Sequence, residues 1–370
     1  MSNPGIQVSS EAVYVHVPFC RAICGYCDFK RQLYKEDLAD KWLKQIDVDL
    51  SKVTGPAKRL YLCGGTPSAL NKKQLETFLS SLDHLVPLNN GEYTTEANPE
   101  NLTLDKIKLF KQHGVNRVSL GVQSFHDQIL KTLERVHHPD QVIKVITELR
   151  NEGITNISID LMYSLPGQTL EDWKEDLRKA TSLKVQHISL YSLTIEENSR
   201  FGKEKKEPLD NDCEFAMYKY AIEYLTSCGY LQYEISNFAL PNYESKHNLA
   251  YWHYEDFVGV GLGAAGKKGH IRYTHVGSLE DYLAGKVNDE VVKLSDKDVH
   301  FEAIMMGLRL NEGIERKDLI SRFGFDPVKE YPQAIKQNLA KGYLVCDDKN
   351  LKVTTEGRYL LNEVLEDFLE

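Results

Sequence analysis

Long apolar runs are missing from this chain of 370 residues. No segment approaches the roughly 20 consecutive apolar residues that a membrane-spanning helix needs. The first residues, Met1–Gly5, also lack the basic stretch and the apolar run of a secretory signal. We therefore expect a cytoplasmic protein without a membrane span.

Cysteine is also scarce, and the 54 acidic residues outnumber the 45 lysines and arginines. Four of the seven cysteines, Cys63, Cys213, Cys228 and Cys346, are scattered without regular spacing. Such scatter is typical of reduced thiols and does not form a disulfide framework. The formal net charge of -9 argues against a nucleic-acid surface, so we expect no nucleic-acid partner. At this length the chain can form one large domain with a smaller appendage.

The other three cysteines, Cys20, Cys24 and Cys27, follow the spacing Cys-x3-Cys-x2-Cys. Three thiolates can bind three irons of a 4Fe-4S cluster and leave the fourth iron open. The amino and carboxylate groups of S-adenosylmethionine could chelate that iron, and the reduced cluster could then cleave the cofactor to a 5'-deoxyadenosyl radical. The alternatives are ordinary thiols or a zinc site that a distant histidine completes.

Short apolar runs alternate with longer amphipathic stretches between residues 12 and 193. The short runs predict six strands, over Ala12–Val17, Arg59–Cys63, Glu92–Ala97, Arg117–Val122, Asn156–Leu161 and His187–Leu193. Helical spacing predicts helices over Glu36–Val53, Lys72–Leu85, Leu104–His113, Pro139–Glu152 and Leu170–Ser182. This alternation predicts an α/β fold in which a parallel sheet with right-handed crossovers forms a partial barrel of six strand–helix units, similar to a TIM barrel.

Polar and glycine-rich segments follow the predicted strands. The cysteines come after the first strand, and Gly64, Gly65 and Thr66 come after the second. Glu96, Gln123 and Asp160 lie at the ends of the third, fourth and fifth strands. Because the carboxyl ends of barrel strands form one face, we expect these residues to share one binding mouth.

Two of these segments have chemistry that suits S-adenosylmethionine. Gly64 and Gly65 leave the backbone open to close approach, and we expect their loop to seat the amino group of the methionine moiety. The carboxylate and amide groups of Glu96, Gln123 and Asp160 could bind ribose hydroxyls or the amino group. Hydrogen bonding to neighbouring loops is the alternative for each of them.

Three further side chains are candidates because of their positions. Arg135 could meet a carboxylate or the adenosyl group, although an ordinary ion pair is the alternative. Tyr14 and Tyr26 flank the cysteine loop and could pack on the adenine or its sugar, or belong to the core. The sequence does not identify a catalytic side chain.

We divide the whole chain into three parts, the last two of which follow the predicted barrel. We assign residues 1–193 to the barrel and residues 194–295 to an extension that packs on its open side. Residues 296–370 read as a small domain similar to a winged helix, with helices over Phe301–Leu308, Glu315–Phe323 and Val328–Lys341, a hairpin at Asp347–Asn350 and a final helix. The acidic composition makes DNA binding by this domain improbable.

The extension contains an unusual segment with an imidazole and two large aromatic rings within six residues. Its heme candidates are His247, Asn248, Tyr251 and Trp252. Imidazole ligates iron, and aromatic faces pack on a porphyrin. The residues alone leave open a structural role for His247, which is the commoner role of a single histidine beside aromatics.

Several motifs together resemble one known family. They are the cysteine segment Tyr14–Phe29, Gly64-Gly-Thr-Pro-Ser68, Glu96-Ala-Asn-Pro99, Arg117–Phe125 and Asp160–Gln168. The chain resembles, over nearly its whole length, the radical S-adenosylmethionine family of oxygen-independent coproporphyrinogen III oxidases and their relatives. By this resemblance Cys20, Cys24 and Cys27 hold the cluster, Tyr14, Gly64 and Glu96 contact the cofactor, and Tyr26, Gly65, Thr66, Gln123, Arg135 and Asp160 line the same cavity.

Within the family, the chain is more similar to the heme chaperones than to the oxidases. The oxidases carry a fourth cysteine where this chain has Phe29, and a longer segment before the first strand, where this chain has 11 residues. The segments Tyr233–Phe238 and His247–Trp252 also look like the heme chaperone subgroup. The resemblance therefore implies a carrier that binds heme, a 4Fe-4S cluster and S-adenosylmethionine and hands the heme to an acceptor, such as a membrane-associated respiratory protein. It also implies possible dimerisation through the cluster region.

Two enzymatic alternatives use the same cofactors. One is decarboxylation of the propionates of coproporphyrinogen III, and the other is radical modification of heme itself. The chain also departs from the family pattern at four positions. Cys63, Glu134 and Ser164 stand where relatives usually have glycine, and Ala265 stands where a histidine is common.

Overall fold

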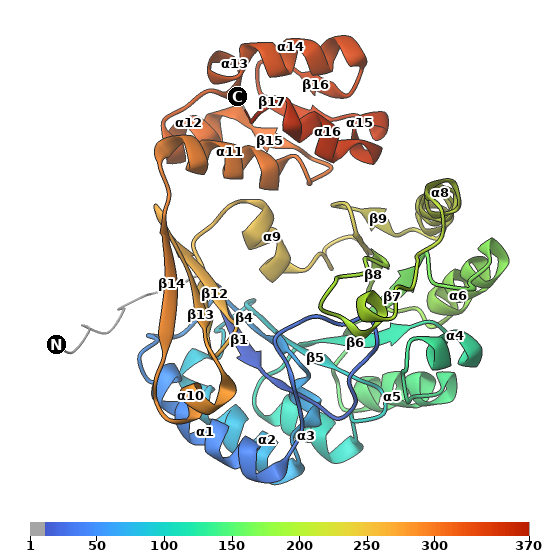
Figure 1. Cartoon of the computed structure of the whole chain (residues 1–370), viewed down its shortest axis with the longest axis vertical. Coiled ribbons are helices and arrows are strands. Elements are labelled where there is room, and N and C mark those ends of the chain that lie inside the picture. Colours follow the sequence, from blue (N-terminus) through green and yellow to red (C-terminus); the bar gives the residue numbers. More distant parts are fainter. Residues whose placement is uncertain (1–11, 370) are drawn as a thin grey trace.

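A computed structural model gives the fold for residues 12–369. Its centre is a set of six parallel strands, β1 (Ala12–Val17), β4 (Arg59–Gly64), β5 (Glu92–Ala97), β6 (Arg117–Gln123), β7 (Asn156–Tyr163) and β8 (His187–Ser192). Each predicted strand is confirmed to within two residues at its ends. Figure 1 shows these strands enclosed by helices on their outer side.

The six strands pair in chain order, as expected for successive strand–helix units. The sheet order among the described residues is β11-β1-β4-β5-β6-β7-β8-β10-β9. The neighbouring strands from β1 to β8 are all parallel, and each pair is joined by a crossover. Strands β11 and β9 form the two edges of the sheet and do not pair with each other. The sheet is therefore a partial barrel that does not close. This confirms the predicted fold class.

The helices pack on the outside of this sheet. They are α1 (Glu36–Leu50), α2 (Lys72–Ser81), α3 (Leu104–Gln112), α4 (Asp127–Thr132), α5 (Pro139–Asn151) and α6 (Leu170–Ser182). Trp42 of α1 and Phe78 of α2 are fully buried, with ring centroids 5.1 Å apart. Asn71 and Thr169 begin α2 and α6 with capping boxes, which satisfy the first free backbone amides. The sequence pattern missed α4, which is too short to show helical periodicity.

The predicted extension contributes to the barrel sheet itself. Its helices are α7 (Arg200–Lys203), α8 (Asn211–Ser227), α9 (Lys246–Trp252) and α10 (Leu279–Leu283). Strands β9 (Leu231–Gln232) and β10 (Asn237–Ala239) extend the sheet beyond β8, and β11 (Val258–Val260) lies parallel to β1 at the other edge. A separate antiparallel sheet contains β12 (Ala265–Lys268), β13 (Ile271–Val276) and β14 (Asn288–Lys293). Strands of two or three residues are too short to be recognised from alternation.

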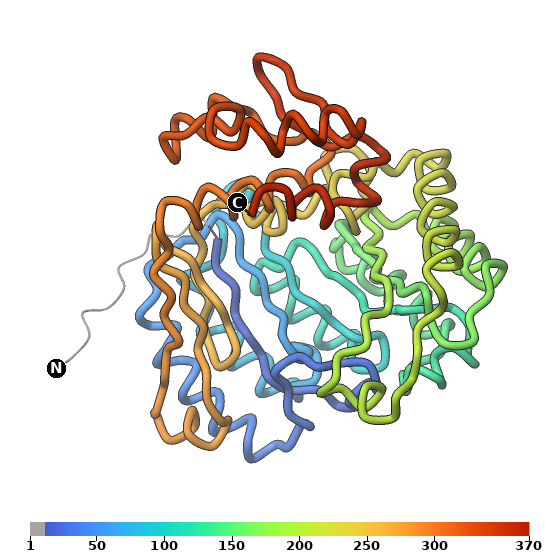
Figure 2. The backbone as a smooth tube through the Cα atoms, turned by 45° about the horizontal axis from the view of Figure 1, so that its top comes forward, coloured from blue at the N-terminus to red at the C-terminus, as the bar shows by residue number. Residues whose placement is uncertain are grey.

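The C-terminal part has a hydrophobic core of its own, which includes Ile304, Leu308, Leu351 and Val364. Its helices are α11 (Asp296–Gly307), α12 (Arg316–Phe323), α13 (Pro327–Glu330), α14 (Pro332–Lys341), α15 (Thr355–Tyr359) and α16 (Leu361–Glu366). Its sheet has the order β15 (Ile314–Glu315), β17 (Asn350–Val353), β16 (Leu344–Cys346). Figures 1 and 2 show this part lying across one end of the barrel, with α9 between the two in Figure 1.

Candidate functional site

The cysteine loop is held at its base by two short strands. Strand β2 (Phe19–Cys20) pairs in parallel with β3 (Gln32–Leu33), so residues 21–31 form a loop that leaves the barrel mouth and returns. Cys20 is buried, and Cys24 and Cys27 are partly exposed. The Sγ of Cys20 lies 3.8 Å from the hydroxyl of Thr66, which places the second-strand loop directly beside the cysteines.

Burial keeps two of the cysteines protonated, and an arginine contacts the third. Burial raises the pKa of Cys20 to about 11 and also raises the pKa of Cys27. These thiols therefore stay protonated until a metal displaces the protons. Arg135 donates from Nη1 to the Sγ of Cys24 at 3.5 Å, which fixes the guanidinium beside the cysteine loop.

Arg135 is itself fixed by other contacts. Its Nη2 donates to the carbonyl oxygen of Gly121 at 2.7 Å and to Oδ1 of Asn98 at 2.9 Å. The amide of Asn98 in turn donates to the hydroxyl of Thr66 at 3.2 Å. Asn98 thus connects the arginine with the loop beside Cys20. Sequence reasoning did not single out this asparagine, although it lies in the Glu96–Pro99 motif at a strand end.

The glycine pair is required by close packing against the cysteine strand. Gly64 has φ of +110°, and a Cβ there would lie 2.6 Å from the ring of His16. A Cβ on Gly65 would lie 2.6 Å from the carbonyl oxygen of Phe19, and its amide already donates to Val17 at 2.7 Å. The amide of Gly65 is therefore used within the fold. The role of this loop in seating the cofactor stays a prediction.

Two carboxyl groups lie inside the barrel near its mouth. Tyr61 donates its hydroxyl to Oε1 of Glu96 at 2.8 Å, and Ser119 donates to Oδ1 of Asp160 at 3.1 Å. Burial, with a smaller contribution from the charge of Asp160, raises the pKa of Glu96 to about 7. Burial also raises the pKa of Asp160. Cys63 is close enough for its own pKa to be raised by burial and by Glu96.

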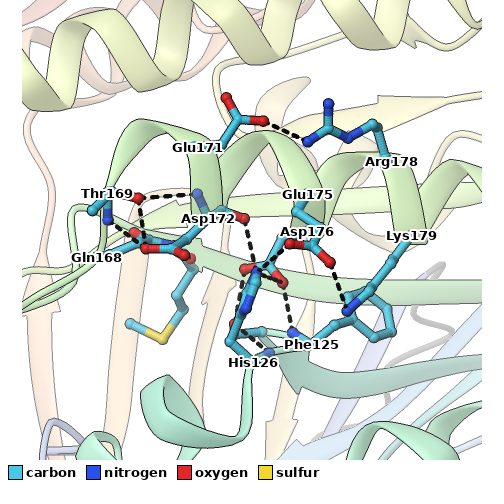
Figure 3. Close-up of polar contacts among 12 residues, drawn as sticks. Phe125, His126, Gln168, Thr169, Glu171, Asp172, Glu175, Asp176, Arg178 and Lys179 are labelled. Carbon is cyan, nitrogen blue, oxygen red and sulfur yellow. Dashed lines mark hydrogen bonds and ion pairs between the residues drawn. The ribbon is translucent and has the colours of Figure 1, made fainter.

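Gln123 ends β6 in a strained conformation. Its φ is +66°, and the pairing of β6 with β7 shifts register between Gly121 and Gln123. The next two residues are held by Asp176 of α6, which accepts from the Phe125 amide at 2.6 Å and from the Ser124 hydroxyl at 2.8 Å. Figure 3 shows Asp176 pointing from α6 toward Phe125 and His126. Helix α6 therefore sets the position of the loop that follows Gln123.

Tyr26 and Tyr14 have different surroundings. Tyr26 packs edge-on against Phe201, with ring centroids 6.5 Å apart, and thereby joins the cysteine loop to α7. Tyr14 lies on β1 with its hydroxyl 3.1 Å from Nδ1 of His16, and its ring stacks on Tyr61 at 6.5 Å. Burial raises the pKa of both tyrosines. The barrel mouth thus gathers the three cysteines, Thr66, Asn98, Gln123 and Arg135 around one loop.

The predicted heme segment lies at the other end of the strands. The backbone amides of Lys246 and His247 donate to the carboxylate of Glu92, the first residue of β5. His247 is 1% exposed, and its Nε2 lies 2.8 Å from the hydroxyl of Tyr251. Asn248, Tyr251 and Trp252 are partly exposed. The structure therefore does not bring the heme candidates together with the cysteine loop, and it buries the imidazole.

The donor set has the chemistry of an iron–sulfur site. Cys20, Cys24 and Cys27 are three thiols at one loop, and thiolates are the usual ligands of iron–sulfur clusters. Cys24 and Cys27 are partly exposed, and the guanidinium of Arg135 lies beside Cys24. Within residues 12–369 no three His, Cys, Asp or Glu side chains are gathered so that they could hold one metal ion.

Two protein-family models match this chain. The model of the Radical SAM superfamily matches residues 14–180, and the model of the HemN C-terminal domain matches residues 294–360. The radical S-adenosylmethionine fold carries a 4Fe-4S cluster and S-adenosylmethionine as its cofactors.

Relatives that are similar over nearly the whole chain identify the family within this class. The chain is 37% identical to the heme chaperone HemW of Lactococcus lactis, with 97% of each chain covered. It is 33% identical to HemW of Bacillus subtilis, over 97% of this chain and 99% of the relative, and 34% identical to HemW of Escherichia coli, over 98% and 99%. The chain belongs to the HemW family of heme chaperones.

Among solved structures, the chain is similar to the coproporphyrinogen III oxidase HemN of Escherichia coli. The TM-score is 0.84 at 21% identity, covering 96% of this chain and 89% of that chain. At this identity the likeness establishes the shared fold. No helix in the described part of the chain is both long and apolar enough to cross a membrane.

Proposed function

We propose that this protein carries heme, binding it reversibly and handing it to an acceptor protein. The observation that carries the proposal is the likeness to proteins named heme chaperones, which spans 97% of this chain and 97% of the Lactococcus relative. Phe29 supports it, because it replaces the fourth cysteine of the oxidases and its side chain is 65% exposed beside the cysteine loop.

The residues that we assign to the cofactors and to heme lie at opposite ends of the barrel. Cys20, Cys24 and Cys27 hold the 4Fe-4S cluster, and Arg135 keeps a positive charge beside Cys24. The polar groups at the mouth and inside the barrel, which are Tyr14, Tyr26, Gly64, Gly65, Thr66, Glu96, Gln123 and Asp160, orient S-adenosylmethionine. When bound there, the cluster and S-adenosylmethionine would supply one-electron chemistry at this mouth.

Heme binds at the opposite end, in the neighbourhood of His247, Asn248, Tyr251 and Trp252. The acceptor is a heme protein, and we propose a membrane-associated respiratory protein as its type. Two copies of the chain associate through the cluster region. The protein works in the cytoplasm, where the reducing conditions preserve both the cluster and the free thiols.

The decisive experiment compares heme transfer with enzymatic turnover. The full chain is reconstituted without oxygen, loaded with heme, and mixed with an apo-cytochrome whose absorbance reports heme uptake. In parallel, it is incubated with coproporphyrinogen III, S-adenosylmethionine and a reductant. We expect transfer of heme and no protoporphyrinogen.

Cys24→Ala serves as the cluster-deficient variant, and Cys228→Ala, which removes an exposed thiol far along the chain, is the matched control. Formation of protoporphyrinogen over many turnovers would make the protein an oxidase. Loss of the heme absorption band only when S-adenosylmethionine is added would instead identify a heme-modifying enzyme.

A further inference from the structure

The cysteine loop is held at its middle by the short helix α7, which lies far along the chain. Gly25 and Tyr26 are the two residues between Cys24 and Cys27. The backbone amide of Phe201 in α7 donates to the carbonyl oxygen of Gly25 at 2.9 Å. The Phe201 ring packs edge-on against the ring of Tyr26, with centroids 6.5 Å apart. One residue of α7 therefore touches both residues that separate the two cysteines.

Phe201 fits closely against this loop and is fully buried. A Cβ on Gly25 would lie 2.2 Å from the Phe201 ring, so the absence of a side chain on Gly25 allows this approach. The ring belongs to a small hydrophobic cluster, separate from the main core, that includes Leu133, Leu165 and Leu193. These leucines follow β6, β7 and β8, and the carbonyl oxygen of Leu133 accepts from the Gly25 amide at 3.4 Å. The contact is therefore part of the packing at the barrel mouth.

An ion pair closes the same contact at the surface. Arg200 of α7 pairs with the carboxylate of Glu134, and its Nη2 also donates to the carbonyl oxygen of Ile23 at 3.4 Å. The side chains of Arg200 and Glu134 are 51% and 32% exposed, so their pair contributes little to the free energy of unfolding. Its effect is local, because it ties α7 both to the segment after α4 and to the residue before Cys24.

The backbone of Glu134 has a conformation that costs energy. Its φ is +60°, in the left-handed region where a residue with a Cβ is less stable than glycine. A glycine at this position would remove that cost, but it would also remove the carboxylate that Arg200 meets. The stability of the backbone and the ion pair therefore favour different residues at position 134, so an experiment can separate the two effects.

We propose that α7 is a clasp that keeps Cys24 and Cys27 in place for one 4Fe-4S cluster. Phe201, Arg200 and Glu134 are the positioning residues of this clasp. The inference rests on the cluster site of the proposed function and is independent of heme transfer. Strands β2 and β3 fix the two ends of the loop, and α7 fixes the stretch between the two cysteines. Holding this stretch before the cluster binds reduces the conformational entropy that binding must remove.

The test measures the rate of iron release to a ferrous chelator from the full chain, after its cluster is reconstituted without oxygen. We expect Phe201→Ala to release iron about 10- to 100-fold faster than the wild type, the factor by which metal affinity falls when groups that orient metal ligands are lost. Arg200→Ala should release iron roughly two- to fivefold faster, as expected for an exposed ion pair. Phe201→Leu keeps most of the buried volume, so its rate should lie between those of the wild type and Phe201→Ala.

Glu134→Gly distinguishes the clasp from a general effect on stability. We expect its urea unfolding midpoint to equal or exceed that of the wild type, because the cost of the left-handed backbone is gone. Iron release should nevertheless be roughly two- to fivefold faster, because Arg200 loses its partner. Unchanged or slower iron release from this variant would show that global stability, and not the clasp, controls cluster retention, and it would overturn the proposal.

Lys203→Ala is the matched control, because Lys203 is an exposed cation at the other end of α7. It should release iron at the wild-type rate.

Hydrogen exchange of the metal-free chain gives a second readout. Residues 21–31 should exchange faster in Phe201→Ala and Arg200→Ala than in the wild type, whereas α1 should keep its wild-type rate. Wild-type iron release from folded Phe201→Ala, or equal acceleration of exchange in α1, would overturn the clasp. A wild-type chain that takes up no iron would refute the cluster site together with the clasp, whereas a normal cluster without heme transfer would refute only the carrier function.

Discussion

Glu96 is the side chain at which charge and burial oppose each other most clearly. Burial raises its pKa to about 7 from 4.5. The folded chain therefore holds this proton more tightly than the unfolded chain does. The stabilising contribution is complete below pH 4.5 and is lost as the pH rises through about 7.

Replacing Glu96 with glutamine should remove this pH dependence. We expect the stability of Glu96→Gln relative to the wild type to increase between about pH 5 and about pH 8, because only the wild type must ionise a buried carboxyl. Urea unfolding at both pH values measures the difference. Glu100→Gln, three positions beyond the strand, is the control, and parallel pH profiles for Glu96→Gln and wild type would contradict the prediction.

Ser164 has a left-handed backbone conformation, which glycine adopts at a lower energetic cost. Its φ is +61°, and its buried hydroxyl has no hydrogen-bond partner among the described residues. We expect Ser164→Gly to increase the free energy of unfolding by about 1 kcal/mol, the cost of a left-handed conformation for a residue with a Cβ. Chemical denaturation measures the change. Ser164→Ala keeps the Cβ and should gain less, and an equal gain in both variants would show that the hydroxyl, and not the backbone, is responsible.

At the scale of elements, α6 holds the loop after β6 through one carboxylate. Asp176 is fully buried and accepts from both Ser124 and Phe125. Asp176→Ala leaves two buried donors without partners, so we expect a loss of about 2–4 kcal/mol of stability. Urea unfolding tests this value, with Glu175→Ala as a control on the same helix, since Glu175 is half-exposed.

The same substitution should alter the mouth of the barrel. Gln123 precedes the anchored residues and depends on them for its position. We therefore expect weaker binding of S-adenosylmethionine by Asp176→Ala at a temperature where the variant is folded. Calorimetric titration of the reconstituted protein measures this binding. Unchanged affinity despite lower stability would separate the anchor from the cofactor site.

At the scale of the whole molecule, Arg322 joins the C-terminal part to α9. Its guanidinium donates to the carbonyl oxygens of His253 at 2.7 Å and Tyr254 at 3.0 Å. Hydrogen bonds from a charged group contribute about 1.5–3 kcal/mol, so we expect Arg322→Ala to accelerate amide exchange at residues 253–256 by roughly tenfold or more. Hydrogen-exchange mass spectrometry measures it. Lys329→Ala removes an exposed cation of the same domain and should change nothing, whereas equal acceleration in both variants would contradict a local role for Arg322.

This contact matters for the proposed heme segment, because it ties the end of α9 to the C-terminal part. Met306 of α11 and Tyr251 of α9 line one cavity of about 440 Å³ although 55 positions separate them in the chain. The division into residues 1–193, 194–295 and 296–370 stays a prediction, although the C-terminal part has its own core.

The amino-acid sequence was enough to predict the alternation of strands and helices, because β1, β4, β5, β6, β7 and β8 are each at least six residues long. It also determined the cysteine loop, since the spacing of three thiols is local information. The family resemblance followed from short motifs at strand ends. The very short strands β9, β10 and β11 lacked such a signal, and tertiary pairing alone created them.

The contacts between residues far apart in the chain depend on tertiary packing. Asn98 lies between Arg135 and Thr66, and its contact with Arg135 spans 37 positions of sequence. Asp176 accepts a hydrogen bond from Phe125 across 51 positions. His247 of α9 is buried because it packs against Tyr61 of β4 and its backbone amide binds Glu92 of β5. Local pattern fixes which elements form, whereas the packing of elements far apart in the chain determines which side chains are buried, charged or open to a ligand.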